Sequence, residues 1–335
     1  MHYSLICTGK GKQHYAPELS EPVPCDFLRL EVNFATICGS DYMVLQGTHP
    51  YKKYPAILGH ELVGKVVQNS ENSRFQCGEL VTALSYGSCG RCDYCQKRLT
   101  NHCSEKITYN TAGSSGAFSR HMDVHESSLV AVPEDAAPHD FVLAEPLSIV
   151  LHALQKVSVQ ASDNVLIIGA GAMGLLSAIV CREVHDVSNV TLLETHPSRG
   201  AFAKSLGFLN AAQFGDIPQN SVDLIIVAGG SALDFDQALS RLNIGGTLVL
   251  ISYFDSPSQL DMNTIVRKEI RLAGSFLSTL DDLNSAVEMI KHSQQAASLL
   301  SKVVVEHISF AQLKDFMQRT DTIGKTIVAS PGVIS

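Results

Sequence analysis

The chain of 335 residues contains no tryptophan, and only 7% of its residues are aromatic and 17% charged. No apolar run approaches the ~18 residues that a membrane-spanning helix requires. The opening stretch, MHYSLICTGKGKQ, lacks the long apolar core of a signal peptide. Basic residues are outnumbered, and a net charge of −8 opposes binding to nucleic-acid phosphates. We therefore expect a cytoplasmic protein with neither a membrane nor a nucleic-acid partner.

Apolar residues make up 45% of the chain, which is enough for sizeable cores. Because one core seldom organises this length, we expect two domains of roughly 150 residues each. The nine cysteines of such a chain indicate thiols and metal ligands more than disulfides, since reducing compartments keep thiols reduced.

Two different residue patterns follow one another along the sequence. Residues 1–150 contain short β-type runs such as LVGKVVQNS, broken by Gly, Pro and Asn, which predicts a β-rich domain. Over 151–283, apolar runs such as NVLIIG and VDLIIVA alternate with helical segments. Continuous apolar strands are buried on both faces, so this part predicts a doubly wound parallel sheet in an α/β protein. A mixed pattern returns over 284–335.

Four cysteines lie close together in SYGSCGRCDYCQKRLTNHC, and they are Cys89, Cys92, Cys95 and Cys103. The spacing C-x2-C-x2-C-x7-C suits a tetrahedral zinc site in a lobe at about 85–105. Four thiolates leave no open coordination position, so this zinc should be structural. Four unrelated buried cysteines are the alternative. A zinc ribbon that binds nucleic acid would look similar, but the cluster carries only three Lys or Arg.

The stretch NVLIIGAGAMGLLSA contains G-x-G-x-x-G, formed by Gly169, Gly171 and Gly174, after a strand and at the start of a helix. Met173 lies inside the motif. Glu194 ends the next strand, twenty residues past Gly174, where a carboxylate accepts hydrogen bonds from the adenosine ribose. This carboxylate favours NAD over NADP, whereas Arg199 nearby keeps NADP open. A glycine-rich turn that binds nothing is the alternative.

Three short motifs, CGSD, GHE and AEPLS, precede the dinucleotide motif. Together with the cysteine lobe and GAGAMG they occur in the order seen in the zinc-dependent medium-chain alcohol dehydrogenase family, and the chain resembles its sorbitol and polyol dehydrogenase branch. The resemblance implies a GroES-like catalytic domain over 1–150, a Rossmann domain over 151–283 that binds NAD, and a return to the catalytic domain over 284–335. It also implies two Zn²⁺ per chain and a homodimer or homotetramer.

The resemblance also assigns site residues. It implies a catalytic zinc held by Cys38, His60, Glu145 and, directly or through water, Glu61. By the same resemblance, Asp41 would orient His60, and Ser40 would take the proton of the substrate alcohol. Three protein ligands and a water leave a position for the substrate oxygen, whose alcohol would lose hydride to nicotinamide in a cleft between the domains.

The chain departs from the family pattern at one position that concerns proton transfer. Many relatives place a relay histidine five residues after the ligand cysteine, where this chain has Met43. His49 is the nearest histidine, but its residue type in this loop favours a solvated residue over a relay. Lys52 and Lys53 precede His60 and would suit an anionic sugar derivative, although solvated lysines are the favoured alternative.

The substrate stays open at this point. The family oxidises secondary alcohols of polyols, sugar acids and sugar phosphates, and L-threonine in a neighbouring branch. Two other readings are a non-catalytic NAD-binding sensor or scaffold and a zinc-free quinone-reductase-like enzyme. Both of these predict fewer than two zinc ions per chain.

Overall fold

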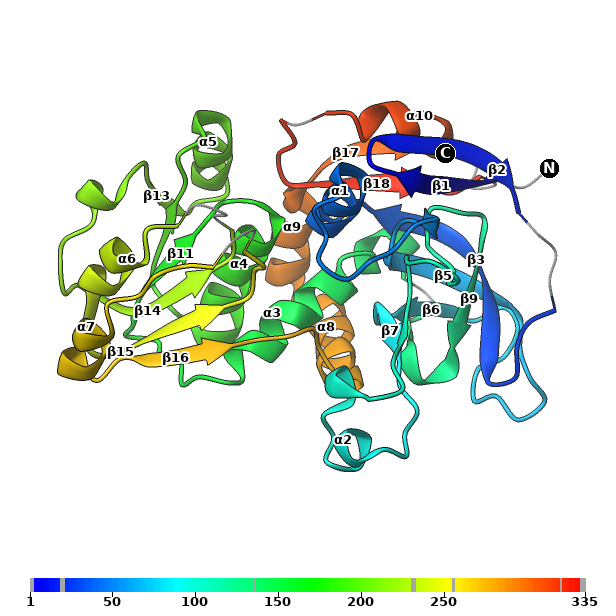
Figure 1. The fold of residues 1–335 in the computed structure, drawn as a ribbon, viewed down its shortest axis with the longest axis horizontal. Coiled ribbons are helices and arrows are strands. Elements are labelled where there is room, and N and C mark those ends of the chain that lie inside the picture. The colour runs from blue at the N-terminus through cyan, green and yellow to red at the C-terminus, as the bar shows by residue number, and fades with distance from the viewer. Residues whose placement is uncertain are drawn as a thin grey trace. The chain divides into compact units, whose positions relative to one another are not determined.

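The computed structural model describes residues 3–18, 22–134, 136–229, 233–254, 257–319 and 321–331. The chain forms two compact units (Figure 1). The first comprises residues 1–148, 278–293 and 304–335, and the second comprises 149–277 and 294–303. The chain thus re-enters the first unit at 278, earlier than the predicted 284, and its helix α9 (Gln294–Val303) belongs to the second unit.

The first unit is rich in short strands. Its strands are β1 (Tyr3–Gly9), β2 (Lys12–Pro17), β3 (Phe27–Thr36), β4 (Ala56–Ile57), β5 (Glu61–Gln68), β6 (Leu80–Ala83), β7 (Tyr86–Gly87), β8 (Ile107–Thr108), β9 (His121–His125), β10 (Leu129–Ala131), β17 (Val304–Ser309) and β18 (Lys325–Ala329). Its helices are α1 (Gly39–Gln46), α2 (Asp93–Gln96), α8 (Leu280–His292) and α10 (Phe310–Phe316), and α3 (Ala144–Leu154) begins in it.

The main sheet of this unit has the strand order β10-β6-β5-β3-β18-β17, with β9 paired to β3. Its central strand β3 shows why the sequence folds this way. Leu28, Leu30 and Val32 alternate with more polar residues and are 0%, 0% and 1% exposed. This period of two directs one face of β3 into the core. The C-terminal strand β18 pairs antiparallel with β3, so the end of the chain completes the sheet.

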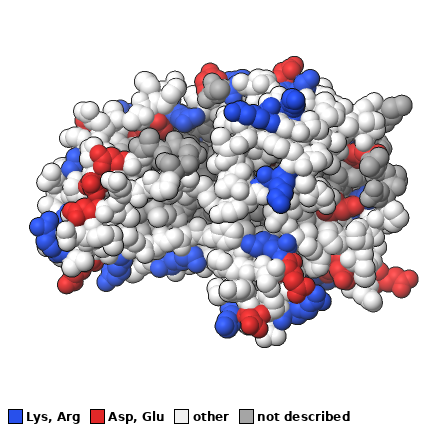
Figure 2. Space-filling view, in the orientation of Figure 1, with Lys and Arg blue, Asp and Glu red and all other residues white. Residues whose placement is uncertain are grey.

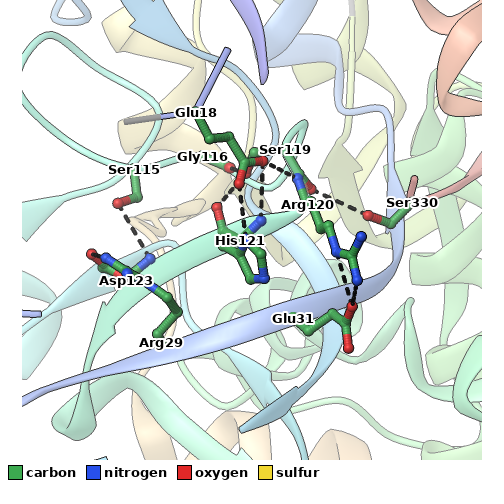
Figure 3. Close-up of polar contacts among 10 residues, drawn as sticks. All are labelled: Glu18, Arg29, Glu31, Ser115, Gly116, Ser119, Arg120, His121, Asp123 and Ser330. Atoms are coloured by element: carbon green, nitrogen blue, oxygen red, sulfur yellow. Dashed lines mark hydrogen bonds and ion pairs between the residues drawn. The ribbon is translucent and has the colours of Figure 1, made fainter. Parts of the chain in front are cut away.

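Charged pairs lie along β3 and the neighbouring strand β9, and they include Arg120 just before β9 and Glu18 (Figure 3). Arg29 Nε lies 2.7 Å from Asp123 Oδ1, and Arg120 Nη2 lies 2.8 Å from Glu31 Oε1. His121 Nδ1 is 2.9 Å from a carboxylate oxygen of Glu18. A one-residue slip of β3 would move Arg29 and Glu31 to the opposite face, so their two pairs agree with the buried leucines on one register.

The second unit contains one parallel sheet. Its strands are β11 (Asn164–Ile168), β12 (Asn189–Leu193), β13 (Leu209–Ala211), β14 (Val222–Val227), β15 (Leu242–Leu250) and β16 (Arg271–Gly274). Its helices are α4 (Ala172–His185), α5 (Pro197–Ser205), α6 (Phe235–Arg241), α7 (Met262–Lys268) and α9, with most of α3.

The strand order is β13-β12-β11-β14-β15-β16, and every described pair in this sheet is parallel. Successive residues of β11, including Leu166 and Ile167, are buried at 1% and 0% exposure, so the strand is covered on both faces. The doubly wound sheet expected from the sequence is confirmed.

The distribution of surface charge and the character of the helices bear on which binding partners the protein could have. Basic and acidic side chains are both scattered among uncharged ones on the face drawn in Figure 2. Among the helices of the described ranges, none has the length and apolar character needed to cross a membrane.

Candidate active site and metal centres

Three potential metal ligands meet at one end of the β3–β5 pair in the first unit. Cys38 precedes the first residue of α1, two residues after β3 ends, and His60 precedes Glu61, the first residue of β5. Because β3 and β5 run antiparallel with Thr36 opposite Glu61, the end of one strand meets the start of the other. The ligand atoms of Cys38, His60 and Glu61 all lie within 4.8 Å of one another.

A buried polar network fixes His60. Asn110 Nδ2 is 2.9 Å from His60 Nδ1 and 3.2 Å from Asp41 Oδ1. Asp41 Oδ1 lies 3.8 Å from the same ring nitrogen, so Asn110 makes the closer contact with the ring. The contacts of Nδ1 with Asn110 and Asp41 fix the orientation of the His60 ring.

Asp41 is itself held in place by backbone donors. Its carboxylate accepts hydrogen bonds of 3.0 Å from the backbone N–H groups of Cys38 and Gly59. Burial acts to raise the pKa of Asp41, but the hydrogen bond and charge of His60 hold it well below its usual range. The carboxylate is therefore ionised and links the two loops that carry Cys38 and His60.

Glu61 forms a buried ion pair that the sequence reasoning missed. Both carboxylate oxygens contact Lys325 Nζ, and Thr36 Oγ1 donates a hydrogen bond to Oε2. Glu61 and Lys325 are 1% and 3% exposed. Burial opposes the charge of Lys325, but the carboxylate of Glu61 raises its pKa, so the lysine stays protonated. In the sequence, the feature that could have indicated this ion pair was the single lysine at the start of the apolar run KTIVA.

Glu145 lies outside the group of three ligands. It sits in the first turn of α3 and is 3% exposed. Burial raises the pKa of Glu145 to about 7, Glu61 adds to the rise, and His60 and Lys325 oppose it. The structure therefore brings Glu145 into the same electrostatic environment, but it groups only Cys38, His60 and Glu61 as neighbouring ligands.

Ser40 carries a buried hydroxyl group. It lies in the first turn of α1, and its Oγ is buried without a hydrogen-bond partner among the described residues. A buried hydroxyl without a partner is costly, which favours a site where a bound molecule supplies the missing hydrogen bond.

The loop after α1 holds His49, the histidine nearest in sequence to the relay position at Met43. His49 is partly buried, and its Nδ1 accepts hydrogen bonds from the backbone N–H groups of Tyr51 and Lys52 at 3.3 and 3.2 Å. The backbone N–H of His49 donates a hydrogen bond to the backbone carbonyl of Met43 at 3.2 Å. Burial, and then the charge of Lys52, lowers the pKa of His49 to about 4. His49 is thus a neutral residue that orders the loop.

The two lysines of this loop differ in exposure. Lys53 is exposed, whereas Lys52 is partly buried and hydrogen-bonds Asn110 Oδ1 through Nζ. Asn110 therefore joins Lys52 to His60, a contact that no local sequence signal pointed to.

The chemistry of the donor group fits a zinc ion. A thiolate, an imidazole and a carboxylate together suit Zn²⁺ better than Mg²⁺ or Ca²⁺, which prefer oxygen ligands. Although burial and Lys52 lower the pKa of His60, the neighbouring Cys38 and Asp41 raise it well above its ordinary value, so the pocket favours a positive charge.

The four cysteines of the lobe also converge. Cys89, Cys92, Cys95 and Cys103 form one group whose ligand atoms lie within 4.8 Å of one another. The Sγ atoms of Cys89 and Cys103 are 3.5 Å apart, and those of Cys89 and Cys95 are 4.0 Å apart. A tetrahedral zinc with Zn–S of about 2.3 Å requires S···S of about 3.8 Å, so the group fits this metal. The lobe around α2 is separate from the Cys38 group (Figure 1).

The glycine motif in the second unit has the geometry of a dinucleotide loop. Gly169 has φ 98°, which favours glycine, and Gly171 has open space where a Cβ would lie. A Cβ at Gly174 would lie 1.9 Å from the Gly169 carbonyl oxygen, so only glycine lets α4 start this close to β11. Met173 lies in the first turn of α4.

Glu194 is positioned at the tip of the neighbouring strand. Its carboxylate accepts hydrogen bonds from the backbone N–H groups of Ala170 at 3.0 Å and His196 at 2.8 Å. It is therefore fixed beside the glycine loop. Arg199 lies in α5, five residues further on, and is partly buried.

Both units match described families. Residues 26–134 match the alcohol dehydrogenase GroES-like domain, and residues 172–292 match the zinc-binding dehydrogenase family. The chain belongs to the zinc-dependent medium-chain alcohol dehydrogenase family. It is accordingly an oxidoreductase, and the fold of a GroES-like unit and a Rossmann unit expected from the sequence is confirmed.

Similar proteins act on sugar derivatives. A sorbitol dehydrogenase of Halalkalibacterium halodurans is 27% identical, covering 89% of this chain and 90% of that protein. An L-galactonate-5-dehydrogenase of Escherichia coli K12 is 27% identical, covering 94% of each chain. The fold is similar to that of an alcohol dehydrogenase from Escherichia coli CFT073 solved with NADH, with a TM-score of 0.86, 24% identity and coverage of 98% of this chain and 99% of that one.

Proposed function

We propose that this enzyme is a zinc- and NAD-dependent dehydrogenase that oxidises a secondary alcohol of a polyol, sugar acid or sugar phosphate to the ketone. The observation that carries the proposal is the grouping of Cys38, His60 and Glu61 in the unit that also contains the unpartnered hydroxyl of Ser40. The relatives named as sorbitol and L-galactonate dehydrogenases support the substrate class.

The chain's own residues account for the steps around the substrate. Cys38, His60 and Glu145 would hold zinc, with Glu61 binding it directly or through water, and the bound zinc would act as a Lewis acid that lowers the pKa of an alcohol toward neutrality. Ser40 Oγ accepts the hydroxyl proton of the substrate and passes it toward solvent, because Met43 has no group that can carry it. Backbone donors engage Nδ1 of His49, so a part for His49 in this transfer would require its Nε2.

Glu194 supports NAD as the cofactor. A carboxylate fixed beside the glycine loop accepts hydrogen bonds from ribose hydroxyls and repels a 2′-phosphate. NAD supplies the hydride acceptor when bound. Replacing Glu194 with Ala should reduce the ratio of kcat/KM with NAD to that with NADP by about tenfold or more. A wild-type enzyme that turns over faster with NADP at equal low concentration would contradict this assignment.

The partners follow from the same reading. They are a small-molecule alcohol and further copies of the chain in a homodimer or homotetramer, and we propose no nucleic-acid or membrane partner. Two zinc ions per chain, one in each ligand group, complete the proposal.

The decisive experiment combines metal analysis with a substrate panel. Protein purified without chelator should contain two zinc ions per chain and should reduce NAD with at least one polyol, sugar acid or sugar phosphate. L-Threonine belongs in the panel because it separates the neighbouring activity. A zinc content of one or zero, or turnover of L-threonine alone, would contradict the proposal.

A further inference from the structure

Two lysines lie in the electrostatic environment of the Cys38, His60 and Glu61 group, and only one of them is fully engaged. Lys325 Nζ contacts both oxygens of Glu61 and the carbonyl oxygen of Ile37, so its three donors have three acceptors. Lys52 Nζ has one hydrogen-bond acceptor among the described residues, Asn110 Oδ1. Two of the three donors of Lys52 therefore remain for a ligand.

Hydrogen bonds of the surrounding loop fix the orientation of the Lys52 side chain. His49 Nδ1 accepts hydrogen bonds from two successive backbone N–H groups, those of Tyr51 and Lys52. Lys53 N–H donates to Thr111 Oγ1 at 3.0 Å, and Lys53 O accepts from Ala112 N–H at 3.0 Å. These bonds fix the loop against residues 110–112, so that Lys52 turns inward to Asn110 while Lys53 stays exposed.

The hydrogen bonds of the Asp41 carboxylate come from donors other than Lys52, although its charge acts on Lys52. The Asp41 carboxylate already accepts hydrogen bonds from Cys38 N–H, Gly59 N–H and the Asn110 amide, and it makes none with Lys52. Burial lowers the pKa of Lys52, and the charges of Asp41, Cys38, Glu145 and Glu61 oppose this lowering without cancelling it. A bound anion beside the ammonium would favour its charged form further.

We propose that Lys52 binds an anionic oxygen group of the substrate, a carboxylate or a phosphate, and makes the enzyme selective for acidic sugar derivatives over neutral polyols. This inference rests on the proposed alcohol oxidation at the same site. The carboxylate or phosphate supplies acceptors for the two remaining N–H groups, and its charge matches the ammonium. A neutral hydroxyl in the same place would gain only an ordinary hydrogen bond.

The test compares three matched alcohols, namely galactitol, galactonate and galactitol 1-phosphate, with zinc-loaded wild type and variants at one pH. Wild type should have at least tenfold higher kcat/KM for one of the two anions than for galactitol, and the two anionic arms distinguish a carboxylate from a phosphate. Lys52→Met should lower kcat/KM for the preferred anion by about 10- to 100-fold, the value of one charge-assisted hydrogen bond, and change that for galactitol less than about threefold.

Two further variants serve as controls. Lys53→Met removes the neighbouring, exposed charge and should leave all three values unchanged. Lys52→Arg keeps the charge and should keep the preference for an anion, which also covers the case in which Lys52→Met does not fold. If Lys52→Met loses all three activities equally, the lysine only positions Asn110 and His60, and the proposal is overturned. A wild type that prefers galactitol to both anions would also overturn it.

A binding measurement separates this inference from the proposed function. Calorimetric titration of the NADH complex with the same three compounds should show weaker binding of the preferred anion, by about tenfold or more, to Lys52→Met than to wild type. If no alcohol is oxidised but this difference persists, the proposed function fails and the role of Lys52 stands. If turnover is observed but anion binding is equal in both proteins, the role of Lys52 fails alone.

Discussion

Lys325 is the residue on which the charge balance of the Glu61 carboxylate depends. Replacing Lys325 with Met should leave a buried carboxylate without its cation, which costs about 3 kcal/mol or more of unfolding free energy. The measurement is urea unfolding of protein treated with a chelator, so that no metal compensates. The loss should shrink in zinc-loaded protein, because the metal then supplies a second positive charge to Glu61.

The double variant Glu61→Gln, Lys325→Met is the matched control. It removes both charges, so its unfolding free energy should recover much of the loss seen in Lys325→Met. Equal instability of the single and double variants would argue that Lys325 contributes through packing rather than through the ion pair.

His49 gives a pH dependence whose sign follows from its lowered pKa. The unfolded chain takes up a proton at His49 as pH falls through about 6.5, whereas the folded chain does so near 4. The unfolded state therefore binds more protons in this window, and the folded protein loses stability as pH falls from 6.5 toward 4. The loss from this partly exposed group should be about 1 kcal/mol or less after solvent screening.

The variant His49→Gln isolates this contribution, because its amide oxygen can still accept from the backbone while it does not titrate. Unfolding free energies at pH 7 and pH 5 should differ less in the variant than in wild type. Identical differences in the two proteins would mean that His49 is not the group responsible.

At the scale of elements, the loop around α2 and the Cys38 group should respond differently to loss of a thiol. Cys95→Ser should lose one zinc per chain and reduce the melting temperature or solubility, because a closed four-thiolate site contributes to folding. Cys38→Ser should lose the other zinc and nearly all turnover, with a smaller effect on melting. Metal analysis, calorimetry and activity measured on both variants check this division, and it is wrong if both lose activity while remaining equally stable.

At the scale of the whole molecule, one edge of the parallel sheet carries exposed apolar side chains. Ile244, Met262, Val266 and Leu272, on β15, α7 and the edge strand β16, are 78%, 62%, 73% and 42% exposed. Apolar groups gathered at an unpaired strand edge favour contact with a second copy. We therefore expect a dimer in solution and expect Leu272→Asp to shift it toward monomer in light-scattering measurements.

The opposite edge offers the control. Leu209 on β13 is 64% exposed, and Leu209→Asp should leave the dimer intact. A monomeric wild type, or dissociation of the Leu209 variant alone, would contradict the assignment of the dimer contact to β16.

Much of the fold could be predicted from local pattern. The apolar strands of residues 164–250 indicated a parallel sheet because burial on both faces removes polar alternation, and the glycines marked the turn into α4 because a Cβ at Gly174 has no room. The return of α9 to the second unit had no local signal, since an amphipathic helix does not specify which core it covers.

The sequence by itself determined which residues we propose for the chemistry: the cysteine spacing, the Cys38 and His60 motifs and the glycine loop each place several functional groups within a few residues. Only the tertiary structure decided what surrounds them. Glu61 pairs with Lys325 across 264 positions of sequence, and Lys52 reaches His60 through Asn110 across 58 and then 50 positions. Such contacts form because a buried charge or amide requires a partner, and the partner is supplied by whichever strand or loop the fold brings beside it.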